Sequence, residues 1–325
     1  MHLRQRQNIV GLIFTIGLLS SATAPLLAEI EPGDWLNRMA AAIQTTSYEG
    51  TVIRIQDGEV EVLKVVHTVN DGVIREKVVA QDENGLEIIR VGNEVHSILP
   101  HRKSVLVEQL GDQSLLFSNL PSSEIRFGNE YDVAIVRSER IAGRETILLA
   151  IRPHDGYRYG HRIWLDTETS FPLQTQLIDD NGTAIEELKF AKITLNKEIQ
   201  ASALTTSFSI ENFTWVTQSS GHSAPEIETS WTSDELPAGF RAISTHEEQM
   251  QGSEEMVTHI LYSDGLANVS VFIVASSGKI KMLTGAARLG GSNSYSIEID
   301  EHEITAIGEV PAMTVEHIAT TMRRR

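Results

Sequence analysis

The feature that most constrains the fold is a series of Val- and Ile-rich runs separated by two-residue turn sequences. Asp57-Gly58, Asp71-Gly72, Asn84-Gly85 and Gly92-Asn93 interrupt the first third of the chain at short intervals. Asp-Gly and Asn-Gly adopt the positive φ angles of tight hairpin turns, so consecutive runs should pair as an antiparallel meander. The strands expected are Tyr48–Ile55, Glu59–Val69, Val73–Ala80, Leu86–Val91, Glu94–Leu99 and Ser104–Glu108.

An amphipathic helix is expected before this meander. Leu36, Met39, Ala40 and Ile43 recur at the i, i+3, i+4 and i+7 spacing that places apolar side chains on one helical face. Asp34 stands before the first of them and is expected to be the N-cap. The helix therefore has one apolar face to bury.

The strand pattern breaks at Gly111–Arg126 and then resumes. This interruption contains the apolar residues Leu115, Leu116, Phe117 and Leu120, and it suits a short helix or a flap. A further hairpin turn is expected where two Asp residues, an Asn and a Gly follow each other at 179–182. The strands expected after the interruption are Asp132–Ile141, Glu145–Arg152, Arg162–Asp166, Leu173–Ile178 and Ala184–Leu195.

A second, shorter unit is expected towards the C-terminus. Thr217–Thr229 is small, polar and without apolar periodicity, which is typical of a linker. Pro311 then suits the first turn of a helix, where its missing N–H would be unpaired in any case. The strands expected in this unit are Arg241–Thr245, Met256–Tyr262, Val269–Val274, Tyr295–Ile299 and Glu303–Ile307, and the helical face expected is Val315, Ile318, Ala319 and Met322.

The first residues have the features of a secretory signal peptide. Arg4 and Arg6 precede the apolar run Ile9–Leu19, and small residues follow at 20–24. The run is too short to cross a bilayer, which takes about 20 apolar residues. We therefore expect an exported protein whose signal peptide, residues 1–28, is removed, with cleavage after Ala22 or Ala28. The expected parts of the mature chain are a domain at 29–216, the linker at 217–229 and a domain at 230–325.

Charge and cysteine content exclude several classes of protein. The chain has 27 Lys and Arg against 44 Asp and Glu, a formal net charge of −17. Nucleic-acid binding needs a clustered basic face, so no nucleic-acid partner is expected. The chain has no cysteine. An exported protein of this kind is held by its hydrophobic core and not by disulfide bonds.

Motifs for catalysis, metals and cofactors are weak. Ser276–Lys279 has the Ser-x-x-Lys spacing of serine acyl-transfer enzymes. That chemistry needs the serine at the start of a helix, whereas a glycine after a strand indicates a hairpin turn. The pairs His96 and His101, and His154 and His161, lack the further ligands of a zinc site. We therefore expect no enzyme, no metal site and no cofactor.

A set of short segments spans nearly the whole chain after the signal peptide. The segments of the first half are Trp35-Leu36, Tyr48-Glu49-Gly50, His67, Arg90–Val95, Leu99-Pro100, Arg140–Arg144, Arg152–Gly160 and Ile163–Asp166. Those of the second half are Trp231, Leu236–Phe240, Tyr262–Ala267, Val269–Ile273 and Gly308–Pro311. In this order they resemble the RseB/MucB family, whose members are periplasmic regulators of the sigma-E (AlgU-type) envelope-stress response. The resemblance is weakest over Gly111–Glu130 and in the linker.

The resemblance implies an α+β fold in two parts. The first is a LolA/LolB-like unclosed antiparallel β-barrel around helices with an apolar cavity, and the second is a smaller α+β C-terminal domain. It also implies a partner, the periplasmic segment of a transmembrane anti-sigma factor of the RseA/MucA kind, which the protein shields from site-one proteolysis. A lipid or lipopolysaccharide fragment is the implied release signal.

Two alternatives to a regulator remain at this stage. One is a periplasmic lipid or lipoprotein carrier, and the other is an exported hydrolase built on Ser276 and Lys279. A second domain with its own motifs favours the regulator over a simple carrier, and the missing catalytic motifs count against the hydrolase. The sequence leaves homo-oligomerisation open.

The candidate binding residues fall into two groups. An apolar flap over a concave sheet is a suitable place for an acyl chain, so the lipid-binding candidates are Leu115, Leu116, Phe117 and Leu120. The candidates for partner or interdomain contact are Tyr157, Tyr159, Trp164, Trp231 and Phe240.

Structural roles are expected for other residues of the matching segments. Arg144 and Arg158 should pair with nearby acids such as Asp155 or Asp166. The glycines expected to occupy turns with positive φ are Gly143, Gly156, Gly160, Gly239 and Gly265.

Overall fold

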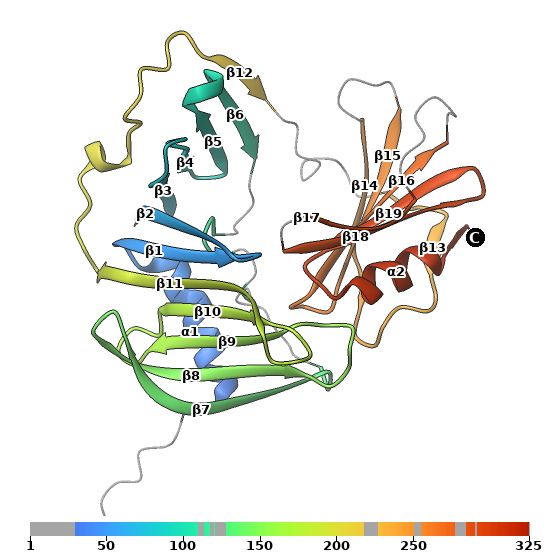
Figure 1. Ribbon diagram of the computed structural model, residues 1–325, viewed down its shortest axis with the longest axis horizontal. Coiled ribbons are helices and arrows are strands. Elements are labelled where there is room, and N and C mark those ends of the chain that lie inside the picture. The colour runs from blue at the N-terminus through green and yellow to red at the C-terminus, as the bar shows by residue number, and fades with distance from the viewer. Residues whose placement is uncertain are drawn as a thin grey trace, which may run out of the picture. The chain divides into compact units, whose positions relative to one another are not determined.

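The computed structural model describes residues 30–109, 114–117, 120, 128–217, 227–249, 255–276, 284–289 and 291–324. The described residues contain a large and a small β-sheet, each with one α-helix, and a two-stranded ribbon (Figure 1). The ends of the large sheet, β7 and β12, do not pair with each other, so the sheet does not close. The predicted fold class, an unclosed antiparallel sheet followed by a smaller α+β unit, is confirmed. The proposed signal peptide lies outside the described residues.

Helix α1 spans Pro32–Thr45 and buries the predicted apolar face. Its N-cap is Glu31, with Pro32 at the first helical position and Asp34 inside the first turn, so the prediction of Asp34 as N-cap was wrong. Proline starts the helix earlier because its fixed φ suits the first turn. The buried residues of the helix are Trp35, Leu36, Met39, Ala40, Ala42 and Ile43.

The large sheet has twelve strands in the order β12-β6-β5-β4-β3-β2-β1-β11-β10-β9-β8-β7. Every neighbouring pair is antiparallel except β12 with β6, and β12 was not predicted. The strands are β1 (Tyr48–Gln56), β2 (Glu59–Asn70), β3 (Val73–Ala80), β4 (Glu87–Val91), β5 (Glu94–Leu99), β6 (Ser104–Gln109), β7 (Tyr131–Ile141), β8 (Arg144–Pro153), β9 (Gly160–Asp166), β10 (Pro172–Ile178), β11 (Ala184–Leu195) and β12 (Thr214–Thr217).

The hairpin turns of the meander have the backbone that their sequences predict. Asp57-Gly58 and Asp71-Gly72 have positive φ at both residues, which is the conformation that matches the twist of the paired strands. β1 and β11 are far apart in the sequence and lie side by side as an antiparallel pair, with Tyr48 opposite Leu195. This pairing links the six meander strands, β1 to β6, to the strands that follow the interruption. Helix α1 contacts both β2 and β7.

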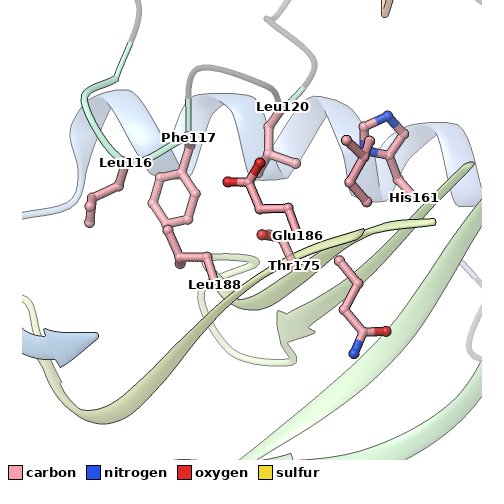
Figure 2. Close-up of a pocket in the computed structure, with 9 residues that line it drawn as sticks. Leu116, Phe117, Leu120, His161, Thr175, Glu186 and Leu188 are labelled. Atoms are coloured by element: carbon pink, nitrogen blue, oxygen red, sulfur yellow. The ribbon is translucent and has the colours of Figure 1, made fainter. Parts of the chain in front are cut away.

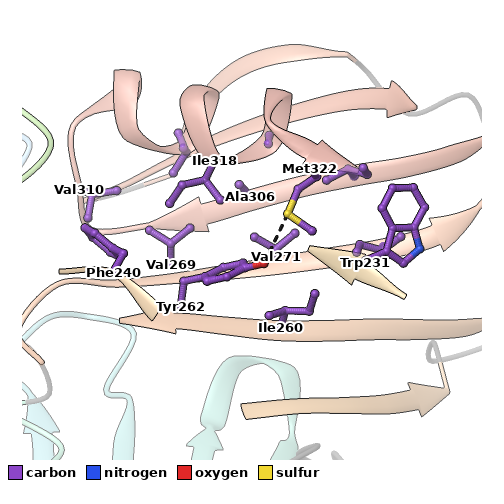
Figure 3. Close-up of a cluster of buried hydrophobic side chains, with 14 residues drawn as sticks. Trp231, Phe240, Ile260, Tyr262, Val269, Val271, Ala306, Val310, Ile318 and Met322 are labelled. Carbon is purple, nitrogen blue, oxygen red and sulfur yellow. Dashed lines mark hydrogen bonds between the residues drawn. The ribbon is translucent and has the colours of Figure 1, made fainter. Parts of the chain in front are cut away.

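The smaller sheet has the order β14-β15-β16-β19-β18-β17, and helix α2 contacts β18 and β19. Its core lies between the sheet and α2 and includes the side chains shown in Figure 3. The elements are β13 (Trp231–Ser233), β14 (Arg241–Gln249), β15 (Met256–Ser263), β16 (Asn268–Ala275), β17 (Gly285–Leu289), β18 (Ser292–Ile299), β19 (His302–Gly308), α2 (Ala312–Thr320) and β20 (Met322–Arg324).

The sequence did not predict the two shortest strands of this unit, β13 and β20. β13 and β20 are three residues each and pair with one another, with Trp231 opposite Arg324. Met322 therefore lies in β20 and not in α2 as predicted, although its side chain is buried in the same core. The Tyr262 hydroxyl donates to the Met322 sulfur at 3.5 Å (Figure 3). Within the described part of the chain, no helix is long and apolar enough to span a membrane.

Candidate functional site

A small apolar pocket lies against the inner face of the large sheet, below the residues of the interruption (Figure 2). Three predicted lipid-binding residues, Leu116, Phe117 and Leu120, line it, whereas Leu115 does not. The strands contribute the other walls, and these are His161, Thr175, Gln176, Leu177, Glu186 and Leu188. The cavity is about 30 Å³, room for one or two water molecules. A site for a small ligand usually has about 300–1,000 Å³.

Aromatic rings fill the space next to this pocket. Phe117 is only 5% exposed, and its ring packs edge-on against Phe171 at 5.7 Å between centroids. Phe190 and Tyr48 complete the cluster, with Tyr48 4.8 Å from Phe171. The apolar interruption therefore occupies part of the concave face with its own side chains, and a larger ligand can enter only if some of the lining side chains move.

A row of side chains across four strands, called the rim row below, supplies three lining residues of the pocket, Glu186, Leu177 and His161. In the strand register Gln56 is opposite Glu186, Glu186 is opposite Leu177, and Leu177 is opposite His161. Residues directly opposite in antiparallel strands point to the same face. The sequence did not reveal this row, because its members lie between positions 56 and 186 and meet only through the register.

The rim row carries two ionisable groups with shifted pKa values. Burial raises the pKa of Glu186, and its Oε2 is buried without a hydrogen-bond partner. Burial lowers the pKa of His161 to about 4, against an opposing effect of Asp264. The imidazole is therefore neutral near pH 7. It can donate or accept a hydrogen bond, but it does not carry the charge that would attract an anionic headgroup.

A second cavity, of about 350 Å³, lies beside the first and is called the junction cavity below. Residues from β9 and β10 form one wall, and residues around β16, β18 and β19 form the other. The lining residues are Tyr159, His161, Leu177, Leu266, Ala267, Asn268, Ser270, Ser292, Ile307, Gly308 and Glu309. The lining mixes hydroxyl, amide and aliphatic groups, which suits a ligand with both polar and apolar parts.

Arg158 joins segments that precede and follow the proposed linker. Its side chain has no exposure, and its guanidinium forms ion pairs with Asp155 and Asp264 and donates to the carbonyl oxygen of Ala238. It also lies over the rings of Tyr131 and Phe240, at 5.6 and 5.0 Å from their centroids. The prediction that Arg158 pairs with Asp155 is confirmed, and Asp264 is the partner that the sequence did not reveal.

Asp264 is itself saturated with hydrogen bonds. Its Oδ2 accepts from the Tyr131 hydroxyl at 2.8 Å, and its Oδ1 accepts from the backbone N–H groups of Leu266 and Ala267. Burial and the neighbouring Asp264 carboxylate raise the pKa of Tyr131 far above its usual value. Tyr131 therefore stays a hydrogen-bond donor at every pH the protein meets.

The two tyrosines beside Arg158 also contact the second half of the chain. The Tyr157 ring lies 5.3 Å from His317, and its carbonyl oxygen accepts from the Thr314 hydroxyl at 2.8 Å. The Tyr159 hydroxyl accepts from the Asn293 side chain at 3.1 Å. Both side chains thus lie at contacts between distant parts of the chain, which fits the interdomain role proposed for them.

The three other contact candidates are mainly core residues. Trp164 is 5% exposed, and its indole N–H donates to Glu139 at 2.5 Å within the large sheet. Trp231 and Phe240 belong to the core of the smaller sheet (Figure 3). Phe240 has a second role, since the Arg158 guanidinium packs on its ring.

Two of the five glycines expected in positive-φ turns occupy other conformations. Gly143, Gly239 and Gly265 have positive φ, whereas Gly156 and Gly160 do not. A side chain at Gly160 would stand 3.1 Å from the carbonyl oxygen of Ile151. This glycine is thus explained by the close approach of β8 and not by a turn.

The structure describes only the first residue of the Ser276–Lys279 motif. Ser276 follows β16 directly and its N–H donates to Glu301 at 2.7 Å, while Lys279 lies outside the described residues. Glu186 and Glu187 point to opposite faces, and Glu187 instead accepts from Gln174 and Gln176. Among the described side chains, no cluster of three His, Asp or Glu could hold a metal ion.

Comparisons with known proteins agree with this architecture. The family model for the MucB/RseB N-terminal domain matches residues 31–208, and the model for the MucB/RseB C-terminal domain matches residues 225–323. The sigma factor AlgU regulatory protein MucB of Pseudomonas aeruginosa is 28% identical over 327 residues, covering 96% of each chain. The sigma-E factor regulatory protein RseB of Escherichia coli K12 is 28% identical over 320 residues, again covering 96% of each.

A solved structure matches over a similar length. The complex structure of Pseudomonas aeruginosa MucA/MucB covers 91% of this chain and 99% of the matched chain, with a TM-score of 0.68 and 25% identity. Two family models in the expected order account for both sheets and for the segments that meet at Arg158. The chain therefore belongs to the MucB/RseB family of sigma-E regulatory proteins.

Proposed function

We propose that this protein is a periplasmic regulator that binds the periplasmic segment of a MucA/RseA-type anti-sigma factor and shields it from site-one proteolysis. The observation that carries this proposal is the match along nearly the whole chain to MucB, whose solved structure is a complex with MucA. The two family models match in the same order along the chain, which supports a shared partner. The basic residues and the short apolar run near the start of the chain support an exported protein.

Release by envelope lipid is the second part of the proposal. It is supported by the apolar pocket and by the three apolar side chains of the interruption that line it. If lipid and partner favour different arrangements of the protein, each must weaken the affinity for the other by the same factor. Couplings of this kind are typically about 1–3 kcal/mol, or about 5–150-fold in affinity.

Titration of labelled MucA periplasmic domain tests both parts. We expect saturable binding in lipid-free buffer, and weaker binding when a lipopolysaccharide fragment is present. The double substitution Leu116→Ser with Phe117→Ser should weaken lipid uptake and leave partner binding in lipid-free buffer unchanged. If partner affinity is the same at saturating lipid, the protein shields its partner constitutively and does not respond to lipid.

A lipid or lipoprotein carrier is the second candidate, and the apolar pocket on the concave face is the observation that favours it. A carrier would bind lipid without binding the MucA domain, so the same titration separates the two. We propose that the protein has no catalytic activity. Ser276→Ala should leave partner binding and protease shielding intact, and a hydrolase activity abolished by this substitution would overturn that part.

A further inference from the structure

The apolar pocket and the junction cavity share a wall. His161 and Leu177 are the two residues that line both cavities. They lie opposite each other on β9 and β10, so their side chains stand next to one another on the same face. Whatever moves these two side chains changes both cavities together.

The sizes of the cavities determine the direction in which this wall can move. The apolar pocket has about 30 Å³, which is too small for an acyl chain. A ligand can enter only if lining side chains move, because close-packed walls do not compress. The junction cavity has about 350 Å³ on the other side of His161 and Leu177. Among the described lining residues of the apolar pocket, these two are the ones that have this empty space behind them.

Contacts of the wall also permit displacement. The described residues offer no hydrogen bond that fixes the imidazole of His161, and Leu177 is held by packing alone. By contrast, Gln176 on the same strand donates to Glu187 at 2.6 Å, and Phe117 packs among aromatic rings. Moving His161 and Leu177 into the junction cavity therefore breaks fewer contacts than moving their neighbours.

We propose that His161 and Leu177 form a movable partition, and that an acyl chain entering the apolar pocket pushes this partition into the junction cavity. This proposal rests on the proposed lipid binding and names the residues through which it acts. Lipid uptake then reduces the volume of the junction cavity. Any group that fills the junction cavity holds the partition in place and opposes lipid uptake, and by reciprocity lipid opposes that group to the same degree.

Filling the junction cavity from its far side tests the partition. Ser292 lines the junction cavity only and is half-buried at the start of β18. Ser292→Trp should weaken binding of the fluorescent fatty acid cis-parinaric acid by about fivefold or more, the lower end of typical coupling between sites. The matched control is Val60→Trp, at a position that is 63% exposed on the β1–β2 hairpin, and it should bind the probe like the wild type.

A second change separates the partition from a general loss of structure. Leu177→Ala removes most of one partition side chain and joins the two spaces. In this background Ser292→Trp should have less effect on probe binding than in the wild type, so the two substitutions should be non-additive. Asn268→Trp, which also lines only the junction cavity, replaces Ser292→Trp if thermal melting shows that the latter is unfolded.

Each outcome decides between the proposals. If the wild type does not bind the fatty acid, the proposed lipid release fails and the partition with it. If the wild type binds and both folded tryptophan variants bind equally well, the partition alone is overturned. Additive effects of Leu177→Ala and Ser292→Trp would also overturn it, because they would show that the tryptophan acts by another route.

Discussion

Buried ionisable residues form a second row across the large sheet, separate from the pocket rim. Tyr48, His67, Glu76 and Arg90 lie opposite one another on β1, β2, β3 and β4, and each is 2% exposed or less. The Tyr48 ring stacks on His67, and its hydroxyl lies 3.4 Å from Glu76. Burial, and then the Glu76 carboxylate, raise the pKa of Tyr48. Three of these residues are in the segments that resemble the family, and their shared row explains why they occur together.

His161 should make the stability of the protein depend on pH. Its pKa is lowered from 6.5 to about 4 by burial, so below pH 6.5 the unfolded chain takes up a proton that the folded chain refuses. The contribution of His161 to the free energy of unfolding is therefore fully retained above pH 6.5 and falls by about 1.4 kcal/mol per pH unit towards pH 4. Urea unfolding at pH 7, 6 and 5 measures this slope.

A matched pair of variants isolates the contribution of His161. His161→Gln should remove most of the slope between pH 6.5 and 4.5, whereas His101→Gln, at an exposed position, should retain it. Equal slopes in the wild type and His161→Gln would show that this imidazole is not held neutral by the fold.

At the scale of elements, β1 is the strand that joins the two halves of the large sheet, and Gly50 is its tightest point. A Cβ at Gly50 would lie 2.8 Å from the carbonyl oxygen of Lys192 and 2.9 Å from the ring of Phe190. The register between β1 and β11 shifts next to it, between Thr51 and Val52. The strand therefore depends on a residue without a side chain at this position.

Gly50→Ala should destabilise the protein by about 1–3 kcal/mol, the usual cost of overpacking a filled core. Gly33→Ala is the matched control, because nothing lies within 4 Å of its added methyl group in α1. Alanine also has a higher helix propensity, so this control should be neutral or stabilising by up to about 1 kcal/mol. Thermal melts compare the two, and equal melting temperatures would contradict the close packing at Gly50.

At the scale of the whole molecule, Arg158 connects three segments that the family resemblance identified separately. These are Arg152–Gly160, Leu236–Phe240 and Tyr262–Ala267, which carry Arg158, Ala238 and Asp264. The first is far from the others in sequence, so the contacts of Arg158 with Ala238 and Asp264 have no local explanation. The three segments instead meet at one fully buried guanidinium.

Arg158→Met should cost about 3–5 kcal/mol, because it leaves the Asp264 carboxylate buried without its cation. It should also let the segments before 218 and after 230 unfold in separate steps, since Arg158 is a contact between them. Differential scanning calorimetry measures both effects. Arg144→Met is the control for the separate steps, because Arg144 also pairs with a buried carboxylate, Asp166, but does so inside the large sheet. A single unchanged transition in Arg158→Met would contradict the connecting role.

Local chemistry determined most of the elements from the sequence alone. The residues of hairpin turns and the alternation of Val and Ile depend on neighbours a few positions away, and β3, β5 and β11 have the predicted bounds. The buried face of α1 was predicted for the same reason. Elements of three or four residues, such as β12, β13 and β20, carry too few side chains to produce a pattern.

Only the tertiary structure decided which distant residues meet. The rim row and the His161–Leu177 partition depend on strand register, because a shift of one residue would turn each side chain to the other face. The pairing of Arg158 with Asp264 joins positions 106 residues apart, and no local pattern encodes a contact at that separation. Burial then sets the protonation of these groups. The sequence shows His161 only as a titratable base, whereas burial in the fold lowers its pKa and keeps the imidazole neutral.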